Sequence, residues 1–213
     1  MSSITPDIIN LLAGIKAGSK VDHIRSERPE TRANAQKSYL ALFEPVEQGD
    51  VTQTERLAVA AFVAGLHRAD QVAEFYASGL AEIPGGASLI GAVNAEVEKG
   101  STQGPYGRFP SGPLSVEDKP GAAFSISEFN AVILGKKLTA VLEHSHLLVF
   151  RPREASPAAL QKLLDAGWST TAIVTLSQIV AFLAFQIRVV VGLSALAAAG
   201  SGAKPQSAAN AAE

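Results

Sequence analysis

The chain has 213 residues, enough for one large domain, and 47% of them are apolar. Only 18% are charged, below the roughly 25% of an average soluble domain, and the formal net charge is −2. This balance argues against a general nucleic-acid binder, and the absence of cysteine excludes disulfides, thiolate metal sites and thiol-based catalysis.

Capping residues, glycine and proline divide the chain into helices. Thr52 and Glu55 form a capping box, Ser125–Glu128 forms a second one, and Ser169 caps a long apolar segment. Valine and isoleucine lie in long runs without alternation, and no Asn-Gly or Asp-Gly hairpin turn is present. We therefore expect an all-α protein. The expected helices cover residues 6–17, 30–43, 57–66, 70–80, 87–99, 129–149, 157–166 and the apolar segment 172–199.

Two segments interrupt this pattern. Residues 100–121 hold five glycines and four prolines, which is typical of a long loop that is either functional or disordered. Residues 200–213 are rich in alanine, glycine and serine and predict a disordered tail after one helical domain over residues 1–199. Within that domain, Val63–Leu66 and Val180–Leu183 match at three of four positions. The match is compatible with two related helical halves, and equally with composition alone.

One segment is apolar enough to be considered as a membrane span. In residues 172–199, however, Gln178, Gln186 and Arg188 lie near the middle, where the hydrocarbon core disfavours an arginine by ~2.5–3.5 kcal/mol. We therefore expect a buried core helix and no membrane partner. Residues 1–10 are polar and acidic, unlike a secretory signal, so a cytoplasmic protein is expected. The low charge predicts a homo-oligomer with an apolar interface.

The densest group of chemically useful residues surrounds the end of the 57–66 segment. His67, Asp70 and Glu74 share one face of a helix, because their spacing is i, i+3, i+7. They could relay a proton, hold a divalent metal ion, or form a solvated face. Glu55 lies twelve residues before His67 and can join them only if the chain reverses near Gly65.

These residues resemble the core motif of the carboxymuconolactone decarboxylase superfamily, in its alkylhydroperoxidase D-like branch. That motif is a glutamate, then after eleven residues Cys-x-x-Cys, then after three more a histidine. Glu55 matches the glutamate, His67 and Asp70 stand at the cysteine positions, and Glu74 stands at the histidine position. The segment from Leu163 to Arg188 is similar to peroxidase-related members.

The resemblance implies an alkylhydroperoxidase D-like fold with two helical halves, but not a thiol peroxidase, since both cysteines are missing. The decarboxylase branch instead implies a cofactor-independent acid–base enzyme that acts on a small organic acid or lactone. Glu55, His67, Asp70 and Glu74 would be its catalytic residues. Two alternatives stay open: a non-catalytic binding or structural subunit that keeps the fold, and a metal site on His67, Asp70 and Glu74.

Further polar residues are candidates for binding a small-molecule substrate. Gln186 and Arg188 lie in the most apolar helix, and Arg188 could bind a carboxylate. Arg108 lies in the long loop and could close over a pocket. His144 and His146 are two residues apart, so we expect them to diverge by ~200° and not to share a site. Their expected role is as cations near a helix C-terminus.

Overall fold

The computed structural model describes residues 6–200, and this part of the chain is all-helical, as predicted. Its α-helices are α1 (Ile8–Leu12), α2 (Lys20–Ser26), α3 (Pro29–Phe43), α4 (Gln53–Leu66), α5 (Asp70–Ala81), α6 (Ala87–Gly100), α7 (Glu128–Phe150), α8 (Pro157–Asp165) and α9 (Thr170–Gly200). Two short 3-10 helices, η1 (Pro113–Glu117) and η2 (Pro152–Glu154), lie beside them. The tail predicted over residues 200–213 lies outside the described residues, except for Gly200, which ends α9.

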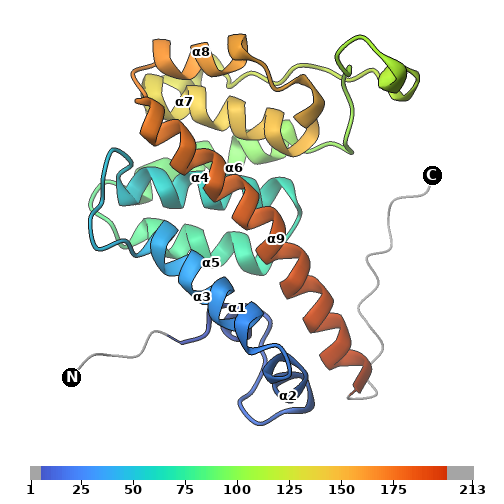
Figure 1. Ribbon diagram of the computed structural model, residues 1–213. Coiled ribbons are helices and arrows are strands. Elements are labelled where there is room, and N and C mark those ends of the chain that lie inside the picture. The colour runs from blue at the N-terminus through green and yellow to red at the C-terminus, as the bar shows by residue number, and fades with distance from the viewer. Residues whose placement is uncertain (1–5, 201–213) are drawn as a thin grey trace.

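Helix α4 forms the centre of the bundle. Every residue from Arg56 to Ala64 is buried, and α4 packs on α3, α5, α6, α7 and α9. Gly65 allows the close approach of α6, because a Cβ atom there would lie 2.7 Å from Cγ1 of Val97. In Figure 1, α7 and α8 cover one end of the bundle, α1 and α2 lie at the other, and α9 crosses between them. The N-terminal half of α9 therefore reaches α7 and α8.

Helix α9 is long and apolar enough to cross a membrane by length and composition alone, which is weak support for a span. It packs on α1, α2, α3, α4, α7 and α8, and 39% of its most apolar 18-residue window is buried. Its outer face is also apolar, with Val174, Phe185, Val191 and Leu196 exposed. The helix is thus a core element on one side and an uncovered apolar surface on the other.

The N-terminal segment differs from the prediction of one helix over residues 6–17. The chain leaves α1 after Leu12 and turns at Gly14 and Gly18, whose φ angles are 64° and 76°. The turn leads into α2, which the sequence pattern did not indicate. Asp7 stabilises the packing of α1 against α2 and α3, since its carboxylate forms ion pairs with Arg25 at 2.7 Å and with Arg32 at 2.9 Å.

The helix predicted over residues 129–149 also differs in two details. Its cap is Ser127, whose side chain accepts a hydrogen bond from the backbone of Asn130, and not the predicted box at Ser125–Glu128. The helix is also broken at Gly135, which has φ 73° and ψ 168°. A β-carbon disfavours that left-handed region, so the position suits glycine. The break starts a second segment that carries the residues of the site described below.

Candidate functional site

The chain reverses directly after Leu66, as the sequence predicts. Three residues join α4 to α5, and the middle one, Arg68, has a left-handed φ of 54°. Its backbone N–H donates to the Gly65 carbonyl at 2.8 Å, which closes the turn. A link this short makes α4 and α5 an antiparallel helical hairpin.

The reversal does not bring Glu55 to Glu74, which corrects the expected pairing of an early and a later acid. Leu57 faces Gly79 across the hairpin, where a Cβ atom would lie 3.5 Å from the leucine Cδ1. Glu55 is therefore level with the end of α5, ~10 Å along the axis from Glu74. Its carboxylate accepts the Thr52 N–H at 2.7 Å and pairs with Lys137 Nζ at 3.0 Å. Glu55 thus caps α4 and ties it to α7.

The other three predicted residues do not share one helix face, since His67 ends α4 while Asp70 and Glu74 belong to α5. Asp70 and Glu74 are exposed, and His67 is half-buried at the C-cap of α4. Burial and the nearby charge of Arg188 lower the pKa of His67, and its Nε2 is buried without a partner. No group of three or more metal-ligating side chains occurs among residues 6–200. The alternative of a metal site on these three residues therefore lacks its geometry.

The predicted substrate-binding residues lie in three different settings. Gln186 is fully buried, and its Oε1 accepts the Tyr76 hydroxyl at 2.7 Å, so it joins α9 to α5. Arg188 is exposed, and its Nη1 donates to the Ala184 carbonyl within the same helix at 2.7 Å. Arg108 is exposed in the long loop, where its backbone N–H donates to Glu154. The structure brings Arg188 near His67, but does not bring Arg108 or Gln186 into a site with them.

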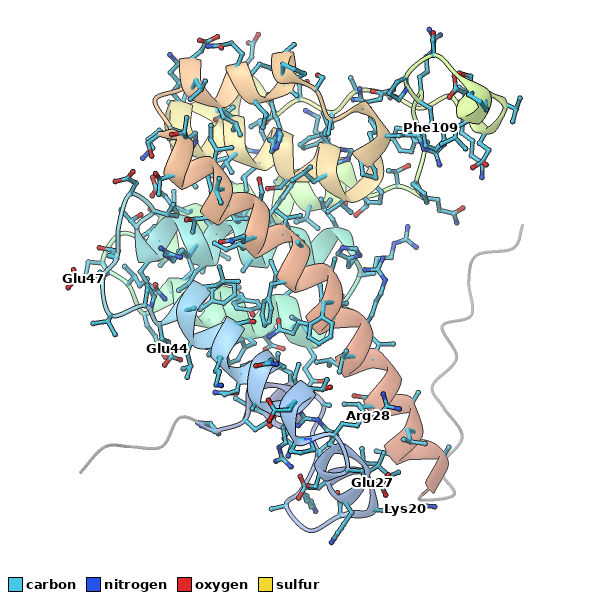
Figure 2. All side chains as sticks on the ribbon, in the orientation of Figure 1. Lys20, Glu27, Arg28, Glu44, Glu47 and Phe109 are labelled. Carbon is cyan, nitrogen blue, oxygen red and sulfur yellow. The ribbon has the colours of Figure 1, made fainter. Side chains whose placement is uncertain are left out.

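The long loop is fastened to the end of α7 rather than to the α4–α5 turn. Tyr106 N–H donates to the Phe150 carbonyl at 2.8 Å, and Gly107 pairs with Lys119 across the loop. Figure 2 shows Phe109 on the part of this loop that projects from the bundle, where the Arg153 guanidinium lies 4.3 Å from its ring centroid. Residues of the loop, together with Lys99 and His146, line a cavity of about 630 Å³.

A second, smaller cavity of about 140 Å³ lies between α7, α8 and residues 123–124, and we call it the α7–α8 cavity. Alanine, phenylalanine and leucine side chains form its apolar part. Its polar and ionisable lining residues are Glu143, His144, His146, Arg151 and Lys162. Phe124 and His146 stack with ring centroids 4.4 Å apart and contribute to both cavities, so this pair separates them.

Two expectations for His144 and His146 are corrected: both residues line one cavity, and burial disfavours their cationic form. Both line the cavity, at 8% and 2% exposure, and burial lowers the pKa of each. His146 Nε2 lies 2.9 Å from the Gly100 carbonyl, so Nε2 must be the protonated nitrogen, and Nδ1 is buried without a partner. The His144 side chain forms no hydrogen bond with any residue in the described range. Its imidazole is therefore free to act on a molecule in the cavity.

The charged groups around these imidazoles differ in how firmly they are held. Arg151 Nε donates to Glu154 at 2.8 Å, which fixes the guanidinium. Glu143 Oε1 accepts the Ile126 N–H at 2.9 Å. Lys162, by contrast, makes no ion pair within the described part of the chain. One fixed and one free cation thus line a space that also holds neutral imidazoles and one carboxylate.

Sequence reasoning missed Glu143, Arg151 and Lys162 as site residues, because they come from two helices that are brought together only by packing. The histidine pair was visible in the sequence, but its burial was not.

In comparisons with known proteins, no family model, no curated sequence and no solved structure matches this chain.

Proposed function

We propose that this protein is a cofactor-independent acid–base enzyme for a small organic acid, of the carboxymuconolactone decarboxylase-like type, and that its reaction takes place in the α7–α8 cavity. One observation carries the proposal: two imidazoles that burial keeps neutral line the same 140 Å³ cavity as the cations Arg151 and Lys162. At the sequence-predicted site, by contrast, Asp70 and Glu74 are exposed beside a half-buried His67.

The residues divide into a base and an anchor. His144 is the general base, because a neutral imidazole without a protein partner can accept a proton from a bound molecule. Lys162 and Arg151 attract the substrate carboxylate, and Glu143 offsets part of their positive charge. In the reaction the C–H bond next to a carbonyl breaks and its proton passes to His144. The electron pair moves to the carbonyl oxygen, where the neighbouring cations stabilise the enolate.

The size of the cavity narrows the substrate. A cavity of about 150 Å³ accommodates a benzene-sized molecule, so the observed 140 Å³ suits about six non-hydrogen atoms. A three-carbon oxo acid such as pyruvate has this size and carries both the carboxylate and an acidic C–H group. A bicyclic or long-chain lactone acid exceeds the cavity. The proposal therefore favours the small-acid part of the predicted substrate range.

Deuterium exchange tests the activity directly. The full chain is incubated with pyruvate in D2O, and loss of the methyl proton signal is followed by NMR. We expect exchange faster than in buffer, with first-order dependence on protein concentration and no requirement for an added cofactor. Exchange at the buffer rate, for pyruvate and for acetoacetate as a second small oxo acid, would reject the acid–base function.

We also propose that the protein is a cytoplasmic homo-oligomer without nucleic-acid or membrane partners. The apolar outer face of α9, with exposed Val174, Phe185 and Val191, supports coverage by a second copy. Light scattering should give a mass of at least twice 22.1 kDa. A charged substitution, Phe185→Glu, should reduce that mass, and recovery of the wild-type chain only from membranes would contradict this part.

A further inference from the structure

A groove of about 940 Å³ lies between α1, α3, α4 and α5, away from the α7–α8 cavity, and we call it the α3–α5 groove. Its floor is formed by apolar and aromatic side chains, among them Tyr39, Phe43, Leu57 and Phe75. Phe43 is 1% exposed, and its ring centroid lies 5.5 Å from that of Tyr39 and 4.8 Å from that of Tyr76. The floor of the groove is thus supported by a packed aromatic cluster.

The rim of the groove has one sign of charge. Glu44, Glu74 and Glu82 line it, while no lysine or arginine of the described chain does. Burial is the main cause that raises the pKa of Tyr39. The Glu44 carboxylate at the end of α3, labelled in Figure 2, raises this pKa further and accepts a hydrogen bond from the Tyr39 hydroxyl. Glu74 and Glu82 are exposed on α5 and form no ion pair within residues 6–200.

The spacing along α5 places these acids over the floor. Glu74, Ser78 and Glu82 follow each other at intervals of four residues, so they form one stripe along the helix, ~12 Å from end to end. The stripe borders the apolar floor along its length, because Phe75 and Gly79 from the adjacent positions line the same groove. An apolar body and a positive charge can therefore be accommodated side by side.

We propose that the α3–α5 groove binds an amphipathic organic cation, a molecule with one ammonium group on an apolar chain or ring. The apolar part would lie on Leu11, Phe75 and Ile83, the apolar lining residues that are not fully buried, and lose its contact with water. The ammonium group would lie beside the Glu74 or the Glu82 carboxylate, and the other carboxylate would attract it at longer range. The volume lies within the range of small-molecule sites, about 300–1,000 Å³, which favours a small ligand over a docked helix.

This binding site is independent of the proposed acid–base function, because it shares no residue with the α7–α8 cavity. It also has the opposite charge: the cavity holds an anion beside lysine and arginine, whereas the groove offers only carboxylates. One protein would thus hold an acid at one end and an amine near the other. Failure of pyruvate exchange leaves the groove proposal standing, and the reverse also holds.

A matched series of eight-carbon probes tests the proposal by isothermal titration calorimetry on the full chain. Octylammonium, octanol and octanoate differ only in the charge of the head group. We expect octylammonium to bind most tightly, octanol less tightly and octanoate least, and we expect higher salt to weaken octylammonium alone. Glu74→Gln and Glu82→Gln should each weaken octylammonium by about fivefold without changing octanol binding.

Two further variants control the result. Glu98→Gln removes an exposed carboxylate of α6 that does not line the groove, and it should leave octylammonium binding unchanged. Ser78→Trp places a large side chain in the groove, and it should abolish binding of octylammonium and octanol while circular dichroism remains that of the wild type. Equal binding of all three probes, or octylammonium binding that survives Ser78→Trp, would overturn the proposal. A drop in oligomer mass with Ser78→Trp would also overturn it, because the groove would then be covered by a second copy.

Discussion

The α4–α5 turn and the α7–α8 cavity contain similar residues and use them differently. Each has histidine and carboxylate side chains within a few positions of one another near the end of an apolar helix. At the turn, Asp70 and Glu74 face water, while Glu55 lies at the opposite end of α4, where it contacts Thr52 and Lys137. In the cavity, α8 and residues 123–124 lie over α7 and enclose His144 and His146. Residues with a chemically useful spacing therefore form a site only where another element of the fold covers them.

The difference also shows what burial does to a histidine. All three buried or half-buried histidines of these regions, His67, His144 and His146, have pKa values lowered by burial. His144 and His146 line a cavity that has space for a second molecule beside the ring. A neutral imidazole that borders a cavity can exchange a proton with a bound substrate. A neutral imidazole in packed surroundings cannot, and its buried ring nitrogen is left without a hydrogen-bond partner.

The largest expected effect is on the rate of pyruvate exchange, and it distinguishes the α7–α8 cavity from the α4–α5 turn as the active site. His144→Gln removes the proposed base and should slow pyruvate exchange by about 100-fold or more, within the usual range for general-base catalysis. The exchange rate is measured by NMR at saturating pyruvate. His23→Gln, an exposed substitution in α2, is the matched control and should retain the wild-type rate. A full loss with His67→Gln, together with an unaffected His144→Gln, would move the site to the turn.

A smaller effect tests the structural role of Glu55. Glu55→Ala removes half of a capping box and an ion pair with Lys137, and it should lower the free energy of unfolding by about 1 kcal/mol. Chemical denaturation measures the loss, and Thr52→Ala should produce a similar one, since both act on the same cap. Loss of pyruvate exchange in Glu55→Ala with unchanged stability would contradict a purely capping role.

The pH dependence of stability tests whether the two cavity histidines are buried as neutral groups. Burial lowers the folded-state pKa of His144 and His146 below the ordinary value of 6.5. The unfolded chain therefore takes up protons first as the pH falls below 6.5, so stability present at pH 7 is lost toward pH 5. Each histidine contributes at most about 1.4 kcal/mol per pH unit. Denaturation at pH 7, 6 and 5 should show this slope, and His144→Gln should flatten it; an unchanged slope would show that His144 is not buried as a neutral group.

The smallest expected effect concerns Asp70. It is exposed at the first position of α5, where a carboxylate gains only a weak interaction with the helix dipole. Asp70→Asn should therefore change the free energy of unfolding by less than about 0.5 kcal/mol. The measurement is the same denaturation experiment. A loss of several kcal/mol would show that Asp70 belongs to a buried network, and would bring the turn back as a candidate site.

Local rules predicted the helices well where a cap or a strong apolar run marked them. Thr52 and Ser169 cap α4 and α9, and the reversal after Leu66 occurs where glycine and polar residues interrupt the apolar run. The break at Gly135 and the separate α2 were missed, because a glycine inside a helical pattern does not reveal its φ angle. The relation to the carboxymuconolactone decarboxylase superfamily and the equivalence of two halves stay predictions.

The candidate site was harder to predict than the fold, because it depends on contacts between distant segments. Spacing shows which side chains share a helix face, but not that Lys162 of α8 comes to line the same cavity as His144 of α7. Likewise, the motif drew attention to Glu55 and Glu74, while the register of the hairpin keeps them apart.

The most direct test of the central claim observes His144 itself. NMR of the ¹⁵N-labelled imidazoles, with His144→Gln used for assignment, reports both its protonation and its contact with a ligand. We expect His144 to be neutral at pH 6.5 and its ring nitrogen signals to shift saturably as pyruvate is added, with weaker binding in Lys162→Gln. A His144 that titrates at the ordinary pKa and ignores pyruvate would contradict the assignment of the α7–α8 cavity as the active site.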